Sequence, residues 1–139
     1  MTRRKHRLLP HTADLRVEVR GKDFPAVCAA SVETLFSLLT DRRRVRRGER
    51  RTLAASGGSE EDRLIAILRK ALLLLYVDRF LVRDAGATMD REKVAVTLHG
   101  ETIDPARHVL YREIKAVTGH GLAVLGGPSG VTARFIVDV

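Results

Sequence analysis

Hydrophobic residues alternate with polar ones in several short stretches of the chain, and in two longer stretches they recur every three or four positions. Alternation is typical of a β-strand with one buried face, and the wider spacing is typical of an amphipathic helix. Leu15, Val17 and Val19 alternate with charged residues before Gly21. This pattern predicts a first strand that begins directly after the stretch HTAD at residues 11–14.

Two helices are predicted from the wider spacing. The first runs from Pro25 to about Leu39, with Asp23 or a neighbour able to cap its start. The second follows Ser59, because an acid at Asp62 completes a motif close to a capping box ahead of the apolar stretch 64–76. We expect the leucine-rich face of this second helix to lie in the core rather than to form a groove for a partner.

The rest of the chain alternates again and predicts further strands. A short strand is expected at residues 51–55, and the second half resembles an antiparallel meander of strands near residues 80–82, 94–98, 114–124 and 131–137. The glycine-rich stretch 126–130 lacks the Lys-Ser/Thr pair of a nucleotide-binding loop, so a hairpin turn is expected there. The predicted class is α/β (α+β), a mostly antiparallel sheet with two helices packed on it.

Length and composition limit the alternatives. A chain of 139 residues has room for one domain, and we expect residues 1–139 to form it. No apolar run approaches the roughly 18 residues that a membrane span needs, and no signal-peptide core follows the basic start, so a cytoplasmic protein without membrane contact is expected. The single cysteine, Cys28, lies among apolar residues at helical spacing, which favours a buried, inert thiol over a nucleophile.

The positive charge is concentrated in two segments. The chain has a formal net charge of +8, and most of its excess lies in a basic arm at residues 1–7 and an Arg-rich loop at residues 41–51. Such appendages are typical of contacts with RNA or an acidic partner, although a solvated loop explains the same pattern. Aromatic residues make up only 4% of the chain, so stacking platforms for single-stranded nucleic acid are not expected.

Acidic groups at two strand ends suggest a metal site. Asp14 lies at the entrance to the first strand, Asp138 lies at the end of the last strand, and the terminal carboxylate of Val139 follows directly. Converging carboxylates repel one another unless a cation or a proton lies between them. The hypothesis is therefore a site for a hard divalent ion, with calcium, magnesium or manganese favoured by ligands that are all oxygen.

Other polar residues have structural explanations beside functional ones. His11 precedes Asp14 and either orients it, binds the metal or caps a turn, and His108 and His120 have no Ser or Cys nucleophile placed beside them by a known motif. Glu101 and Asp104 lie where turns favour acids, and a contact from Glu101 to the rim of the metal site is the alternative. His11, His120 and Glu101 are accordingly possible neighbours of the metal ligands.

Four motifs together resemble the archease family: HTAD at 11–14, GETIDPARH at 100–108, EIKAVTGHG at 113–121 and FIVDV at the end of the sequence. Their order, their gaps and the length of the chain match that family throughout. Archeases are small proteins that assist the GTP-dependent RNA ligase of the RtcB type, which acts in tRNA splicing and RNA repair. The resemblance implies an α/β sandwich and a chaperone-like activator that promotes guanylylation of the ligase, not an enzyme.

The resemblance also implies roles for particular residues. Asp14, Asp138 and Val139, through its terminal carboxylate, match the family's divalent-metal ligands, and Lys115 matches a lysine needed for ligase activation. The stretch LIAILRKA at 64–71 lacks the Asp, the Trp and the Asn-Glu pair usual in the family's second helix, and Gly119 replaces an aromatic residue. The implied partner is an RtcB-type ligase, with tRNA or other RNA bound indirectly or weakly. An RNA-binding chaperone acting through the basic segments and a stand-alone metal-dependent hydrolase are the alternatives.

Overall fold

A computed structural model describes residues 13–139, so His11 and the basic arm at residues 1–7 lie outside the described residues. The elements in chain order are β1 (Asp14–Gly21), α1 (Phe24–Leu39), the short 3-10 helix η1 (Arg42–Arg44), β2 (Glu49–Ala55), α2 (Glu60–Asp78), β3 (Phe80–Asp90), β4 (Lys93–Thr102), β5 (Ala116–Gly127) and β6 (Gly130–Asp138). The predicted positions of both helices and of the first strand are confirmed. The strand expected at 51–55 begins slightly earlier, at Glu49.

Both helices begin at the predicted caps. The carboxylate of Asp23 accepts a hydrogen bond from the backbone N–H of Ala26 at 2.9 Å, which satisfies a donor that the first turn of α1 leaves free. In α2 the hydroxyl of Ser59 accepts from the N–H of Asp62, and the carboxylate of Asp62 accepts from the N–H of Ser59, both at 3.1 Å. This reciprocal pair is the predicted capping box.

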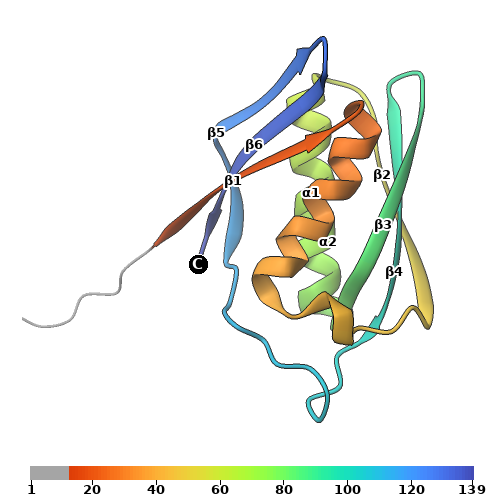
Figure 1. The fold of residues 1–139 in the computed structure, drawn as a ribbon, viewed down its shortest axis with the longest axis vertical. Coiled ribbons are helices and arrows are strands. Elements are labelled where there is room, and N and C mark those ends of the chain that lie inside the picture. Colours follow the sequence, from red (N-terminus) through yellow and green to blue (C-terminus); the bar gives the residue numbers. More distant parts are fainter. Residues whose placement is uncertain (1–12) are drawn as a thin grey trace, which may run out of the picture.

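The strands form two antiparallel sheets of three, in the orders β1-β6-β5 and β2-β4-β3. The two helices lie between the sheets (Figure 1), so the predicted α+β class is confirmed. The expected continuous meander was wrong, because β4 and β5 belong to different sheets and residues 103–115 connect them. Alternation gives each strand one buried face, but it does not say which of two sheets the strand joins.

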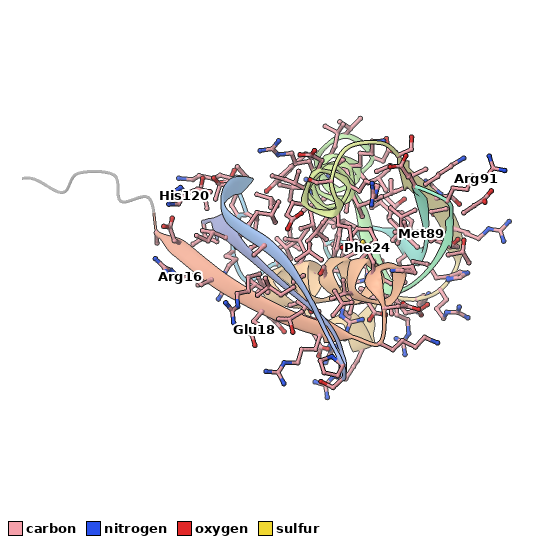
Figure 2. All side chains as sticks on the ribbon, turned by 90° about the horizontal axis from the view of Figure 1, so that it is seen from above. Arg16, Glu18, Phe24, Met89, Arg91 and His120 are labelled. Atoms are coloured by element: carbon pink, nitrogen blue, oxygen red, sulfur yellow. The ribbon has the colours of Figure 1, made fainter. Side chains whose placement is uncertain are left out.

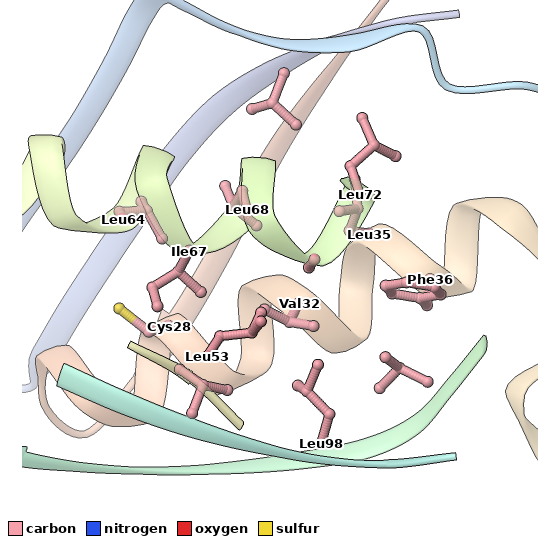
Figure 3. Packing of buried hydrophobic residues seen from close by; sticks show 14 of the residues in the cluster. Cys28, Val32, Leu35, Phe36, Leu53, Leu64, Ile67, Leu68, Leu72 and Leu98 are labelled. Atoms are coloured by element: carbon pink, nitrogen blue, oxygen red, sulfur yellow. The ribbon is translucent and has the colours of Figure 1, made fainter. Parts of the chain in front are cut away.

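The core fills the space between the helices and the sheets. Figure 3 shows side chains of α1, α2, β2 and β4 packed together, among them Cys28, Phe36, Leu68 and Leu98, all fully buried. The leucine-rich face of α2 is therefore core, as predicted. Burial raises the pKa of the Cys28 thiol to about 12, which is consistent with the predicted inert cysteine. None of the helices in residues 13–139 is long and apolar enough to cross a membrane.

The β5–β6 hairpin positions the end of the chain. Gly127 and Gly130 face each other at the turn, as predicted for the glycine-rich stretch, and Gly130 has a φ of +132°, which an L side chain rarely adopts. β6 then runs back as the central strand between β1 and β5. Its last residues are consequently flanked by a strand on each side.

Candidate metal centre at the end of the central strand

The two predicted aspartate ligands face each other across neighbouring strands. In the antiparallel pairing of β1 with β6, Asp14 is directly opposite Asp138. Side chains of directly opposed residues lie on the same face of a sheet, with Cβ atoms about 5 Å apart. The register therefore brings together two carboxylates that are more than a hundred residues apart in the sequence.

The end of β6 is held by backbone hydrogen bonds on both sides. The N–H of Val139 donates to the carbonyl of Ala13 at 3.0 Å, and the N–H of Lys115 donates to the carbonyl of Asp138 at 2.7 Å. The side chain of Val139 also packs against the hydrophobic core. These contacts fix the main chain at Val139, so a carboxylate there would have a defined position beside the aspartate pair.

The aspartate pair lies on the outer face of the sheet. Val17 and Val137 are buried toward the helices, and side chains alternate along a strand, so Asp14 and Asp138 point the other way. In Figure 2, Arg16 and Glu18 project from β1 away from the helices, which shows the same outer face. An ion held there would be accessible to a partner or to a phosphate group.

The donor set fits a hard divalent cation. Within residues 13–139, no hydrogen bond or ion pair is made by the side chains of Asp14 or Asp138, and no three His, Cys, Asp or Glu side chains gather into a metal site. Among the described residues, the main-chain carboxylate of Val139 is the candidate for a third ligand, and water oxygens could complete the set. Carboxylate and water oxygens are the ligands that calcium and magnesium prefer.

Lys115 lies next to this site through its backbone. It is exposed and directly precedes β5, and its bond to the Asp138 carbonyl places it beside the end of β6. His120 also belongs to β5, in a segment where the pairing with β6 shifts register, and its N–H donates to the Thr118 hydroxyl at 3.1 Å. Figure 2 shows its side chain at the surface, and within residues 13–139 no hydrogen bond or ion pair joins His120 to the aspartate pair.

Glu101 lies in the other sheet and has cationic partners of its own. Its carboxylate accepts hydrogen bonds from the Arg107 guanidinium at 2.6 and 3.0 Å and from the backbone N–H of Arg46 at 2.7 Å. Mainly because of the Arg107 hydrogen bond, the pKa of Glu101 falls from 4.5 to about 2. The structure does not bring Glu101 to the aspartate pair, and its contacts instead anchor the start of the 103–115 connection.

His108 completes this anchor. Its ring is buried; Nδ1 accepts from the N–H of Asp104 at 2.9 Å, so Nε2 carries the proton and faces a Glu101 oxygen at 3.1 Å. The structural interpretation of His108 and Asp104 therefore accounts for their contacts. The sequence already groups Glu101, Asp104 and His108, since all three fall within the motif GETIDPARH.

The chain is similar to known proteins over nearly its whole length. Residues 6–139 match the model of the Archease protein family (MTH1598/TM1083). It is 29% identical over 135 residues to "Protein archease" of Methanopyrus kandleri, covering 94% of this chain and 96% of that one. With "Protein archease" of Pyrococcus abyssi it shares 25% identity over 134 residues, covering 93% of this chain and 94% of the relative.

Solved structures share the fold. The solution structure of Methanobacterium thermoautotrophicum protein 1598 superposes with a TM-score of 0.74 at 23% identity, covering 94% of this chain and 96% of that chain. A crystal structure from Thermotoga maritima, described as an archease and possible chaperone, gives a TM-score of 0.69 at 15% identity, covering 99% of this chain and all of its own. The family match over residues 6–139, which includes all four motifs, shows that this chain belongs to the archease family.

Proposed function

We propose that this protein binds a divalent metal ion at the end of β6 and activates an RtcB-type RNA ligase by promoting its guanylylation. The observation that carries the proposal is the register of β1 with β6, which sets Asp14 directly opposite Asp138 on an open sheet face. Family membership supports the proposed class of partner, because the motifs around these residues are those that resemble archeases. The ion would be calcium, magnesium or manganese.

The residues have distinct roles in this proposal. Asp14, Asp138 and the main-chain carboxylate of Val139 would hold the ion, which would supply positive charge for phosphate oxygens when bound. Three carboxylates around a dication leave one net negative charge, and the Lys115 ammonium is near enough along the backbone to offset it or to contact a nucleotide phosphate. Each role requires access from solvent, and the exposed outer face provides it.

The direct test is covalent transfer of GMP to an RtcB-type ligase from the same source, measured with and without this protein. The native protein should increase guanylylation and restore repeated turnover. Lys115→Ala should abolish the stimulation and leave the fold intact, because Lys115 is exposed and its structural hydrogen bond comes from its backbone. Full stimulation by Lys115→Ala, or none by the native protein, would argue against the proposal.

The carboxylate at Val139 has a test of its own. Adding Gly-Ser after Val139 keeps every side chain and replaces that carboxylate with an amide carbonyl. Isothermal titration with calcium, magnesium and manganese should then show much weaker binding. An extended protein that binds these ions as tightly as the native one would exclude the main-chain carboxylate as a ligand.

A further inference from the structure

The connection between β4 and β5 folds back onto the segment that follows α1. The Thr40 hydroxyl donates to the carbonyl of Val109 at 2.8 Å, and Thr40 pairs with Leu110 in an isolated antiparallel bridge. The N–H of Tyr111 donates to the carbonyl of Leu39 at 2.8 Å. Both segments lie at the lower end of the molecule in Figure 1. These bonds fix Tyr111 beside the start of the Arg-rich loop.

The structure divides the arginines of that loop into two groups. Arg42 donates to the carbonyl of Arg83, Arg47 pairs with Asp84 at 2.8 Å, and Arg51 pairs with Glu49 at 2.9 Å. The guanidinium of Arg83 in turn donates to the carbonyls of Arg43 and Val45, both at 2.9 Å. The backbone of the loop is therefore held firmly, and part of its charge serves the fold.

The other group faces solvent next to Tyr111. The side chain of Arg43 is 88% exposed although it pairs with Asp41, and Arg44 follows it, also exposed. Arg112 is exposed and donates to the carbonyl of Leu38 at 3.1 Å, which places its guanidinium at the end of α1. Exposed arginines from two distant parts of the sequence thus lie near the end of α1, where Tyr111 is also held.

Tyr111 supplies an aromatic surface within this group. Its side chain is 56% exposed. The pKa of Arg43 is raised above its ordinary value mainly by the hydrogen bond to Asp41 and, to a smaller extent, by the nearby Tyr111 phenol. The sequence as a whole is poor in aromatics, yet folding brings one exposed ring to the arginines. Val109 and Leu110 are exposed beside it and extend the apolar surface.

We propose that Tyr111, Arg43, Arg44 and Arg112 form a binding surface for single-stranded RNA. A base would stack on the Tyr111 ring, and the guanidinium groups would contact the flanking phosphates, which is the combination that single-strand binders use. A duplex keeps its bases stacked on one another, so it has no free base for the ring. The exposed ring favours a nucleic acid over an acidic protein segment, because arginine binds carboxylates as well as phosphates but only a nucleic acid also offers bases that stack on an aromatic side chain.

The position of this surface connects it with the proposed function. Lys115 follows Tyr111 by four positions, and an extended chain spans at most about 3.6 Å per residue, so their Cα atoms lie within roughly 14 Å of each other. A strand bound at Tyr111 would therefore end close to the metal centre. Stacking on Tyr111 does not require the metal, so RNA affinity is best measured in EDTA, where the ion makes no contribution.

Fluorescence polarisation with a labelled single-stranded 12-nucleotide RNA, titrated at several salt concentrations, tests the proposal. Tyr111→Leu should weaken binding about tenfold, and Tyr111→Phe should stay within about twofold because the ring remains. Changing Arg43, Arg44 and Arg112 to Ser should reduce the slope of log K against log salt by about 2, since each lost phosphate contact contributes about 0.7.

A matched control variant also loses three positive charges, but from another part of the surface. Arg20, Lys22 and Lys93 are exposed and lie away from the end of α1, so changing these three to Ser should alter binding much less than the arginine triple. Four results would overturn the proposal: no binding by the native protein at low salt, equal loss in both triples, equal affinity for a duplex of the same sequence, or displacement of the RNA by polyglutamate at equal charge. The last would indicate an acidic protein partner instead.

Discussion

The carboxylate of Glu101 and the carboxylates of Asp14 and Asp138 lie in different sheets and have opposite surroundings. Glu101 accepts hydrogen bonds from a guanidinium and a backbone N–H and faces the ring nitrogen of a buried His108. Asp14 and Asp138 face each other, and within residues 13–139 their side chains meet no cation of the protein. The charge of Glu101 is balanced by neighbouring cations, whereas the described part of the chain supplies none to the two aspartates.

This difference separates a structural acid from a candidate ligand. Glu101 is stabilised in its ionised form by Arg107, so a metal ion would have to displace a strong ion pair to bind there. Among residues 13–139 the aspartate pair has no such cationic partner, so a bound metal ion would stabilise it. Variants at Glu101 should therefore change stability, and variants at Asp14 and Asp138 should change metal affinity.

The largest effect is expected on metal affinity. Replacing a hydrogen-bond partner of a metal ligand commonly costs 10- to 100-fold in affinity, so replacing a ligand in Asp138→Asn should cost at least about 100-fold. Asp14→Asn should behave similarly, and combining it with the Gly-Ser extension should be non-additive, because both act on one ion. Isothermal titration with calcium and manganese measures these affinities.

Glu101→Gln is the control for that measurement. It removes a negative charge of the same size from the other sheet and should leave the metal affinity unchanged. If Glu101→Gln lowered the metal affinity as much as Asp138→Asn, Glu101 would not be a purely structural acid.

The next largest effect is a loss of protein stability when Glu101 is replaced. Glu101→Ala leaves the buried Nε2–H of His108 without an acceptor and takes the Arg107 partner away. The free energy of unfolding should fall by about 2 kcal/mol, which corresponds to roughly 5 to 8 °C in Tm for a domain of this size. Thermal unfolding followed by circular dichroism measures the loss. A variant as stable as the native protein would show that these hydrogen bonds add nothing net.

Part of the stability that the Glu101 carboxylate contributes should depend on pH. The pKa of Glu101 is about 2 in the folded protein against an ordinary value of 4.5. A depressed folded pKa gives stability that is fully present above the unfolded pKa and is lost as the pH falls toward the folded one. The stability difference between the native protein and Glu101→Gln should therefore be constant above about pH 5 and shrink toward pH 2. Urea unfolding at pH 6 and pH 3 tests this, and a difference that grows at pH 3 would contradict it.

Local sequence signals were sufficient for the elements but not for their assembly. Asp23 and Ser59 marked the helix starts because a cap is a contact between residues three apart, and alternation marked β1 and β6 because one face of each is buried. Which strands pair is decided by contacts between distant residues. The separation of β4 from β5 into two sheets was accordingly missed.

The candidate sites show the same limit. Periodicity placed Asp14 and Asp138 at strand ends, and their chemistry and the family resemblance suggested a shared metal site, but only the register shows that they are directly opposite. Nothing in the sequence marked Tyr111 as a neighbour of Arg43, since the contact depends on hydrogen bonds from Tyr111 to Leu39 and from Thr40 to Val109. The number of arginines in the loop is evident from the sequence. Which of them bond to neighbouring groups and which face solvent is not, because that depends on the folded structure.

The smallest predicted effect is a gain in stability, whereas replacing Glu101 by Ala is predicted to cause a loss. Without metal, Asp14→Asn should raise the free energy of unfolding by roughly 0.5 kcal/mol, because like charges directly opposite on neighbouring strands repel each other. Calcium at 100 times the native Kd should stabilise the native protein by about 2.7 kcal/mol and a variant with 100-fold weaker binding by only about 0.4 kcal/mol. Metal should therefore reverse the order of stability, which thermal unfolding with and without calcium will show. If Asp14→Asn were less stable than the native protein in the absence of metal, the aspartate would have a structural partner, and the distinction from Glu101 would disappear.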